Sequence, residues 1–342
     1  MVVPTNTRVL RTQYIPRGEQ FSTDFVQSET IPLSTDLSDG GIIVRNLYLA
    51  LDPYIRFSFE NYNGNGSPLG QTVVGFGIGQ VHASKNSAYP VGSIVVGFNI
   101  GWEEYTHQPN PQLFVIPDTR DPRIDLTEYT NALGINGLTA YAAVKTLVKF
   151  KKDQVVYISS AAGPVGTFFA ILAKRAGAFV VGSAGTDDKV SYLLKEIGID
   201  AAFNYKTKDS RAELDAIAPN GIDIYFDQVA GETLDIALEK LKFNGQVLAI
   251  GNISTVGAKT AYATKNLNLI TVKALTINGF TAFQHLDKFP ELWKEFEPLI
   301  ARGEIRTQKP TVIEGVEHVG QAFKDYLDGK YHGKVIVKVA DL

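Results

Sequence analysis

The stretch that most constrains the fold is residues 154–185, where a strand, a glycine-containing turn, a helix and a second strand follow one another. The two strands read QVVYISS (154–160) and FVVGSA (179–184), and neither contains a charged side chain. Continuous apolar strands of this kind are typical of parallel sheets covered by helices on both faces. The helical spacing predicts one apolar face, formed by Val165, Phe169, Leu172 and Ala176.

The same alternation of strands and helices continues towards residue 280. Four more apolar runs follow, which brings the candidate strands to six: AAFNY, IDIYFDQV, GQVLAIG and LTING. A strand–helix alternation at this spacing predicts βαβ units and therefore a doubly wound parallel sheet.

The two ends of the chain have a different rhythm. Residues 1–128 contain short β-branched runs separated by Gly, Pro and Asn, which is typical of antiparallel strands. After a helix at 286–303, the chain continues with an extended segment, a helix at 316–329 and the strand KVIVKV. We therefore predict an α/β protein with a β-rich domain of residues 1–128, completed by residues 305–342, and a doubly wound domain of residues 129–304.

The turn after the first of the parallel strands resembles the dinucleotide fingerprint G-x-G-x-x-G. Ala161, Gly163 and Gly166 occupy its three positions, and Pro164 lies in the first turn of the helix. In this motif the middle glycine lets the backbone approach a pyrophosphate, and the last lets the helix pack closely on the strand. A tight strand-to-helix turn without a ligand is the alternative. The position of the motif at the head of a βαβ series favours the dinucleotide site.

The end of the second parallel strand indicates which dinucleotide would bind. An NAD site normally carries an acidic residue there, about 20 residues after the fingerprint. This chain has Gly-Ser-Ala-Gly at 182–185, so nothing at the strand's tip would repel a 2′-phosphate. Lys189 and Tyr205 are candidate phosphate contacts, although Lys189 alone would also be an ordinary surface lysine. The sequence predicts NADPH as the cofactor.

Composition excludes several classes of function. The chain has 33 basic and 36 acidic residues, so it lacks the basic excess that nucleic acids and anionic membranes attract. It has no cysteine and five scattered histidines, which disfavours disulfides, thiolate nucleophiles and a cysteine-bound zinc. Its start lacks the apolar core of a signal peptide, and no apolar run reaches the roughly 20 residues of a membrane span. We expect a soluble, cytoplasmic protein.

Several motifs resemble the zinc-independent medium-chain dehydrogenase/reductases, in particular the leukotriene B4 12-hydroxydehydrogenase/15-oxo-prostaglandin 13-reductase group, which includes the plant alkenal double-bond reductases. They occur in the family's order: LALDPYIR, LGINGLTAY, SAAGPVG, GTDDKVSYL, FNYKT, YFDQVAGE and GNIS. The resemblance implies a GroES-like catalytic domain, a Rossmann domain that binds NADPH, a homodimer, and reduction of the C=C bond of α,β-unsaturated ketones and aldehydes.

The resemblance also implies which residues contact the cofactor. The contacts to the pyrophosphate map to Ala162, Gly163, Pro164 and Val165, and Gly166 completes the cofactor-binding turn. The contacts to the adenosine phosphate map to Lys189 and Tyr205. Other contacts map to Gly251, Asn252, Ile253 and Ser254, and to the backbone of Phe280, Thr281 and Ala282 beside the nicotinamide. In the family's arrangement Tyr54 of DPYIR faces the cofactor cleft and borders the substrate.

Three features depart from the family's pattern, the mildest being GINGLTAY where the family often reads GMPGLTAY. Tyr331 in YHGK replaces an asparagine that contacts the cofactor. Val256 replaces a tyrosine that is proposed to donate the proton or to stabilise the enolate, and valine can do neither. Tyr54 is therefore the first candidate for the proton donor. The alternatives are that Tyr54 only packs against the nicotinamide, and that the ribose 2′-hydroxyl or water supplies the proton.

The aromatic residues around Tyr54 allow two interpretations. Phe57, Phe59 and Tyr62 would either line an apolar substrate pocket or belong to the core of the β-rich domain.

These observations predict an NADPH-dependent 2-alkenal/enone reductase that needs no metal. Hydride would reach the β-carbon of a small-molecule enal or enone, and a nearby donor would stabilise the enolate. An NADPH quinone oxidoreductase of the same superfamily and a non-catalytic NADPH-binding protein are the alternatives. No nucleic-acid or membrane partner is expected.

Overall fold

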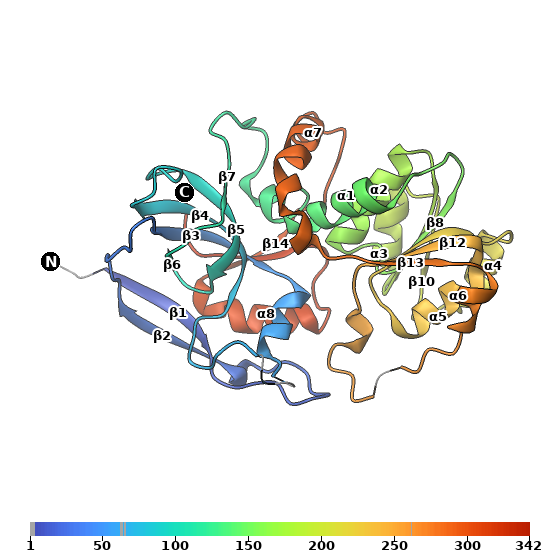
Figure 1. The fold of residues 1–342 in the computed structure, drawn as a ribbon, viewed down its shortest axis with the longest axis horizontal. Helices are drawn as coiled ribbons and strands as arrows, with labels where there is room; N and C mark the ends of the chain where they lie inside the picture. The colour runs from blue at the N-terminus through green and yellow to red at the C-terminus, as the bar shows by residue number, and fades with distance from the viewer. Residues whose placement is uncertain (1–3, 62–63, 65, 261) are drawn as a thin grey trace. The chain divides into compact units, whose positions relative to one another are not determined.

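The computed structural model describes residues 4–61, 64, 66–260 and 262–342. The chain divides into two compact units (Figure 1). One unit consists of residues 1–134 and 309–342, and the other of residues 135–308. The assignment of the two parts as a catalytic and a cofactor-binding domain stays a prediction.

The unit formed by the two ends of the chain is built mainly of antiparallel strands. β1 and β2 form a two-stranded sheet, and a seven-stranded sheet has the order β14-β15-β3-β4-β5-β7, with β6 beside β3. The strands are β1 (Thr5–Arg11), β2 (Val26–Pro32), β3 (Ile42–Leu51), β4 (Val74–Ser84), β5 (Ile94–Gly101), β6 (Tyr105–Gln108), β7 (Phe114–Val115), β14 (Thr311–Glu314) and β15 (Val335–Lys338). Its helices are η1 (Thr23–Phe25), η2 (Pro53–Phe59), η3 (Leu126–Thr130), η7 (Val316–His318) and α8 (Val319–Leu327).

The C-terminal segment completes this unit's sheet and core. β15 runs antiparallel to β3, with Val335 opposite Leu51. Helix α8 adds Phe323 to the core, where its ring lies edge-on to Phe21 at 5.0 Å and to Trp102 at 5.4 Å. The return of the chain's end to the β-rich part therefore supplies both a strand and a core residue.

The unit of residues 135–308 contains a six-stranded parallel sheet in the order β10-β9-β8-β11-β12-β13. The strands are β8 (Val155–Ile158), β9 (Phe179–Ala184), β10 (Ala201–Asn204), β11 (Ile222–Asp227), β12 (Leu241–Ala249) and β13 (Thr276–Gly279). When the six strands are numbered in chain order, the sheet order is 3-2-1-4-5-6, which is that of the Rossmann fold. The direction of winding reverses between β8 and β11. The predicted fold class, a β-rich part with a doubly wound parallel sheet, is confirmed.

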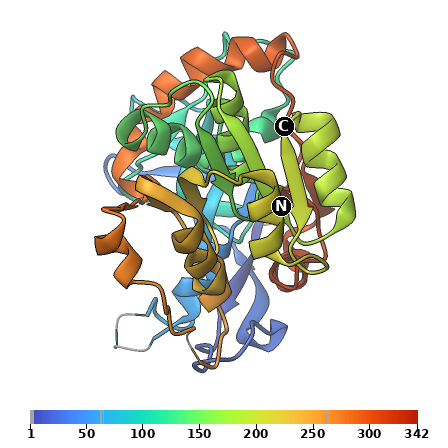
Figure 2. The ribbon, with the colours of Figure 1, turned by 90° about the vertical axis from the view of Figure 1, so that its right-hand side faces the viewer.

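Helices cover both faces of the parallel sheet (Figure 1 and Figure 2). In Figure 1, α1, α2 and α7 lie above the strands, whereas α5 and α6 lie below them. The helices are α1 (Ile135–Leu147), α2 (Pro164–Arg175), α3 (Asp187–Tyr192), which continues into the π-helical turn η4 (Leu193–Ile197), α4 (Ser210–Ile217), α5 (Gly231–Lys240), η5 (Ile253–Thr255), α6 (Asn268–Val272), η6 (Ala282–Lys288) and α7 (Phe289–Ala301). Two-sided coverage explains why the strands are continuously apolar.

The predicted apolar face of α2 was wrong in part. Phe169 is buried and stacks on Phe226 of the sheet at 3.8 Å, but Val165 and Leu172 are only half-buried and Ala176 is exposed. The buried residues of α2 are Gly166, Thr167, Phe168, Phe169, Ala170 and Ala173. The helix packs on the sheet on one side and on α1 and α7 on the other, so its buried surface is wider than a single stripe.

The helix predicted at 286–303 begins later, at Phe289, because the preceding segment forms the 3₁₀ helix η6 with a non-helical His285. Of the apolar residues that its helical spacing would place on one face, Phe289, Leu292 and Phe296 are buried, whereas Leu299 and Ile300 are only half-buried.

Candidate functional site

The fingerprint turn lies between the carboxyl end of β8 and the first turn of α2. Gly163 is the N-cap residue of α2, and Pro164 occupies the first helical turn. The Gly163 N–H donates to the Ser160 carbonyl at 3.0 Å, and the Gly163 carbonyl accepts from the Thr167 N–H at 2.8 Å. These bonds fix the helix start at the sheet edge, where backbone N–H groups and the helix dipole attract anions.

The two glycines of this turn meet different surroundings. A Cβ atom on Gly166 would lie 2.8 Å from Cα of Ala161 and 2.8 Å from the Ser160 carbonyl oxygen, so the close packing of helix and strand requires glycine there. A Cβ atom on Gly163 would meet only Ser160, at 3.3 Å and beyond. The space beside Gly163 is therefore not filled by the chain's own atoms, which fits the approach of a pyrophosphate.

The end of β9 brings two lysines and a tyrosine together. Measured from a Cβ atom built on Gly185, the Tyr205 hydroxyl would be 3.1 Å away and Cε of Lys206 would be 3.4 Å away. Burial of the side chain, and then the charge of Lys206, lower the pKa of Lys189 below its usual 10.5. Two cations that repel each other beside a phenol form a suitable site for a phosphate group.

Asp187 lies close to these cations in sequence, but its carboxylate has a defined partner. The side-chain amide of Asn204 donates to it at 2.8 Å, and the Asn204 side-chain oxygen accepts from the Lys206 N–H at 3.1 Å. Asn204, at the end of β10, therefore holds both the carboxylate of Asp187 and the backbone of Lys206. Lys206 was missed in the sequence, although it directly follows Tyr205.

The turn between β11 and α5 has a strained backbone. Ala230 has φ 61° and ψ −154°, a conformation that is nearly restricted to glycine, and Gly231 follows with φ 57°. The buried carboxylate of Asp227 accepts from the N–H groups of Val229 at 2.9 Å and Ala230 at 2.8 Å, and from the Tyr225 hydroxyl at 2.7 Å. Burial raises the pKa of Asp227, and these hydrogen bonds oppose the rise.

The predicted segment Gly251–Ser254 lies against this turn. The Ile253 N–H donates to the Gln228 carbonyl at 3.2 Å, and the Ser254 hydroxyl donates to the Val229 carbonyl at 2.5 Å. The four residues Gly251, Asn252, Ile253 and Ser254 are exposed, so their backbone is accessible to a ligand. Gln228, which links this segment to the fingerprint turn, was also missed in the sequence.

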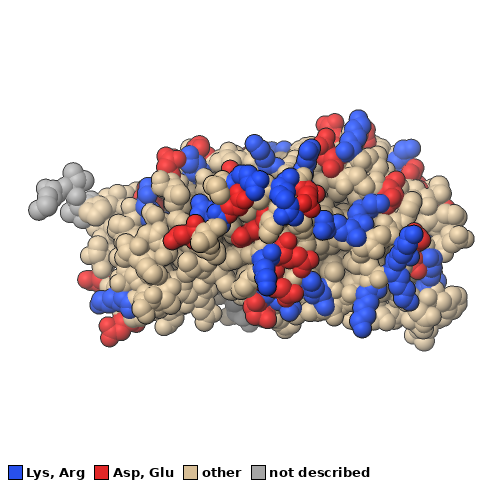
Figure 3. Space-filling view, turned by 90° about the horizontal axis from the view of Figure 1, so that it is seen from above, with Lys and Arg blue, Asp and Glu red and all other residues tan. Residues whose placement is uncertain are grey.

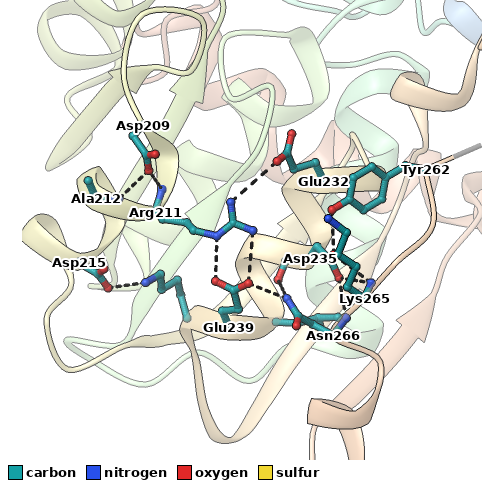
Figure 4. Close-up of polar contacts among 12 residues, drawn as sticks. Asp209, Arg211, Ala212, Asp215, Glu232, Asp235, Glu239, Tyr262, Lys265 and Asn266 are labelled. Carbon is teal, nitrogen blue, oxygen red and sulfur yellow. Dashed lines mark hydrogen bonds and ion pairs between the residues drawn. The ribbon is translucent and has the colours of Figure 1, made fainter.

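The chain beyond Ser254 is fixed again on α5 (Figure 4). The buried carboxylate of Asp235 accepts from the Tyr262 hydroxyl at 3.0 Å, the Lys265 N–H at 3.0 Å and the Asn266 N–H at 2.9 Å. Val256 is half-buried and its side chain has no polar group. Along the chain it lies between Ser254, which is bonded to Val229, and Tyr262, which is bonded to Asp235.

The remaining predicted contacts in this unit follow β13. The Phe280 N–H donates to the Ala249 carbonyl at 3.1 Å, and the Phe280 ring stacks on His285 at 4.9 Å. Thr281 is the N-cap residue of η6, which begins at the buried Ala282. These residues, like the other predicted contacts in the unit, follow carboxyl ends of parallel strands, where doubly wound folds bind ligands.

Tyr54 and Tyr331 belong to the other unit. The Tyr54 hydroxyl is buried, 3.7 Å from a Cβ atom built on Gly75, and the ring lies edge-on to Phe98 at 6.0 Å. Burial, and then the charge of Asp52, raise the pKa of Tyr54 well above its usual 10.0, so the phenol remains protonated at physiological pH. Tyr331 is half-buried against the core of this unit.

The aromatic neighbours of Tyr54 divide between core and surface. Phe59 is fully buried and lies edge-on to Phe21 at 5.1 Å, which identifies it as a core residue. Phe57 is 47% exposed, and Tyr62 lies outside the described residues.

The charged residues show no patch of one sign on the face seen in Figure 3, where basic and acidic side chains are interspersed. Within the described ranges, no group of three or more His, Asp or Glu side chains is arranged to hold a metal ion. No helix in the described part of the chain is long and apolar enough to cross a membrane.

Comparison with known proteins covers nearly the whole chain. A family model described as a zinc-binding dehydrogenase matches residues 164–301, and one described as the N-terminal domain of oxidoreductase matches residues 8–116. A zinc-type alcohol dehydrogenase-like protein of Schizosaccharomyces pombe is 37% identical over 306 residues, 88% of this chain and 87% of its own. An NADP(+)-dependent 2-alkenal reductase of Nicotiana tabacum is 33% identical over 341 residues, 98% of each chain.

Among solved structures, CurA from Vibrio vulnificus in complex with NADPH superposes with a TM-score of 0.88 at 24% identity. The superposition covers 98% of this chain and 100% of that one, and it shows that the two proteins share a fold.

Proposed function

The chain belongs to the zinc-independent medium-chain dehydrogenase/reductases of the alkenal reductase group, and from this premise we propose that it reduces the C=C bond of α,β-unsaturated aldehydes and ketones with NADPH. The observation that carries this proposal is the 33% identity to an NADP(+)-dependent 2-alkenal reductase along 98% of both chains. The substrate would be a small enal or enone, without a nucleic-acid or membrane partner.

The residues at the carboxyl edge of the parallel sheet fit the proposed cofactor. NADPH supplies a hydride when bound, and the protein's part is to hold and orient it. The open space beside Gly163 and the start of α2 would receive the pyrophosphate. Lys189 and Tyr205, together with Lys206, would receive the 2′-phosphate. The further contacts would come from Ala162, Pro164, Val165, Gly166, Gly251–Ser254, Phe280–Ala282 and Tyr331.

Tyr54 is the proposed proton donor. Hydride addition at the β-carbon leaves negative charge on the carbonyl oxygen of the substrate, and a hydrogen-bond donor aimed at that charge lowers the barrier. The phenol keeps its proton over the physiological range and can donate a hydrogen bond to the enolate oxygen, while its raised pKa disfavours complete transfer of that proton. Val256 offers no such group. If Tyr54 proves dispensable, we expect the proton to come from the ribose 2′-hydroxyl of the cofactor or from water.

We also propose that two copies of the chain associate through β13. This strand is last in the sheet order, so one side of it has no neighbouring strand among the described residues. Apolar side chains near that edge are exposed, including Ile277 at 40%, Val272 at 60% and Phe243 at 72%. An exposed edge strand with apolar neighbours favours pairing with another chain. Light scattering would test this proposal. We expect a dimer for the unchanged protein and a monomer for the Ile277→Lys variant.

The proposed activity is tested by an NADPH-oxidation screen over enals, enones, nitroalkenes and quinones. We expect turnover with enals and enones and a product in which the carbonyl is retained. Turnover of quinones alone would favour a quinone oxidoreductase, and binding of NADPH without turnover of any acceptor would favour a binding protein. A cytoplasmic location stays a prediction, which fractionation of cells that express a tagged chain would test.

A further inference from the structure

Gln228 contacts two segments of the proposed cofactor site that are far apart in the sequence. It is the first residue after β11, next to the point where the sheet reverses its direction of winding. One segment is the fingerprint turn, 69 positions earlier in the chain. The other is Gly251–Ser254. A residue that touches both can set how the two are spaced at the edge of the sheet.

The side chain of Gln228 holds the fingerprint turn. Its Nε2 donates to the Ser159 carbonyl at 2.7 Å and to the Ser160 carbonyl at 3.4 Å. The backbone N–H of Gln228 donates to the Ser159 hydroxyl oxygen at 3.1 Å. Ser160 has φ 52°, in the left-handed region, and its carbonyl also accepts the Gly163 N–H. The amide of Gln228 therefore stabilises the strained residue that shapes the turn before Gly163.

The same side chain lies directly beneath the start of α2. A Cβ atom on Gly166 would come within 2.7 Å of Nε2 of Gln228. The third glycine of the fingerprint is thus needed partly to make room for this amide. The fingerprint and Gln228 form one packed unit, although their motifs are separate in the sequence.

The backbone of Gln228 holds the second segment. Its carbonyl accepts the Ile253 N–H at 3.2 Å, and it would lie 3.0 Å from a Cβ atom on Gly251. The next residues are fixed by Asp227, which binds the N–H groups of Val229 and Ala230. These hydrogen bonds hold the backbone that follows Gln228, while the side chain and the carbonyl of Gln228 contact different segments.

We propose that Gln228 is a positioning residue that couples the pyrophosphate-binding turn to the Gly251–Ser254 segment and so sets the affinity for the whole dinucleotide. This inference rests on the proposed function, since it takes both segments to bind NADPH. It assigns Gln228 no contact with the substrate. Replacing Gln228 should therefore weaken the binding of a ligand that spans both segments. It should leave unchanged the binding of a ligand that occupies only the adenosine 2′-phosphate site.

The test compares two variants of nearly the same shape. Gln228→Met removes the donors, and Gln228→Glu places carboxylate oxygens against the two carbonyl oxygens. We expect each to raise the Kd for NADPH about tenfold or more, since the hydrogen bonds that preorganise the turn are lost. The affinity for adenosine 2′-monophosphate, measured by NMR titration, should stay unchanged in both. Lys189→Ala should weaken adenosine 2′-monophosphate as well.

A pH series distinguishes positioning from general damage. When the carboxyl group of Gln228→Glu is protonated it regains one donor, so its Kd for NADPH, relative to wild type, should improve from pH 7 to pH 5. The same ratio for Gln228→Met should stay flat. An unchanged Kd for NADPH in both variants would overturn the inference, as would parallel losses for both ligands with a lowered melting temperature. Wild-type protein that fails to bind NADPH would instead refute the proposed function.

Discussion

Nζ of Lys334 lies 2.6 Å from Oδ1 of Asp52, and both side chains are buried. The two residues are 282 positions apart, so this ion pair joins the residue just before β15 to the N-cap of η2, the helix that carries Tyr54. Burial lowers the pKa of Lys334, and the charge and hydrogen bond of Asp52 oppose that change. The pair is an internal anchor of the unit formed by residues 1–134 and 309–342.

Lys334→Met should therefore destabilise the protein by about 3–5 kcal/mol, because it leaves the Asp52 carboxylate buried without its cation. Urea unfolding followed by tryptophan fluorescence measures this. Lys324→Met is the matched control: Lys324 pairs with Asp328 at the same 2.6 Å, but both side chains are about one-third exposed. An exposed pair on a helix contributes only about 0.3–0.5 kcal/mol. Equal losses in the two variants would contradict the anchoring role of Lys334.

Lys189→Ala should weaken NADPH and leave NADH nearly unaffected, because only NADPH carries the 2′-phosphate. A charge-assisted contact of this kind contributes about 1.5–3 kcal/mol, which is roughly a ten- to hundredfold rise in Kd. Lys206→Met should have an effect of the same sign. Lys208→Ala is the control, because this exposed lysine lies two positions further along and pairs with Glu213. Equal effects of Lys189→Ala on both cofactors would remove Lys189 from the phosphate site.

The affinity for NADPH should also decrease as the pH rises. This decrease should begin at a lower pH than it would if Lys189 had the usual lysine pKa of 10.5. Only the protonated ammonium of Lys189 attracts the phosphate, and its pKa in the free protein is below 10.5. The Kd should therefore rise as the pH passes through that lowered pKa. Lys206→Met removes the neighbouring charge, so the midpoint should move up towards 10.5. Calorimetric titrations between pH 7 and pH 11 measure the midpoint, and an identical midpoint in both proteins would exclude the coupling.

The sequence predicted the fingerprint turn because its signal is local: a strand, a glycine turn and a helix follow one another between Val155 and Arg175. The contacts that surround it were not predictable in the same way. Gln228 reaches Ser159 across 69 positions, and whether its amide points to the turn depends on how β8 and β11 pair. Lys206 follows a predicted residue, yet its position over Gly185 depends on the pairing of β10 with β9.

The wrong face of α2 has a similar cause. A helical pattern predicts one apolar stripe, but burial from two sides depends on α1 and α7, which are distant in the chain. The relation between Asp52 and Lys334 is likewise fixed only when β15 pairs with β3.

Tyr54→Phe should lower kcat for an enone by about 10²–10³, the usual effect of losing a donor to charge that develops in the transition state. The Kd for NADPH should change little, since the proposal gives the hydroxyl to the substrate. Tyr326→Phe is the control, because burial and Asp52 also raise the pKa of Tyr326 but no role in the reaction is assigned to it. An undiminished kcat in Tyr54→Phe would favour a proton from the cofactor's ribose or from water.

The transfer of deuterium from NADPH labelled at C4 of the nicotinamide tests the central claim most directly. The protein should reduce an α,β-unsaturated aldehyde to the saturated aldehyde, and NMR of the product should locate the deuterium on the former β-carbon. Deuterium on the carbonyl carbon, with an alcohol as the product, would contradict the account, because the protein would then act as a carbonyl reductase.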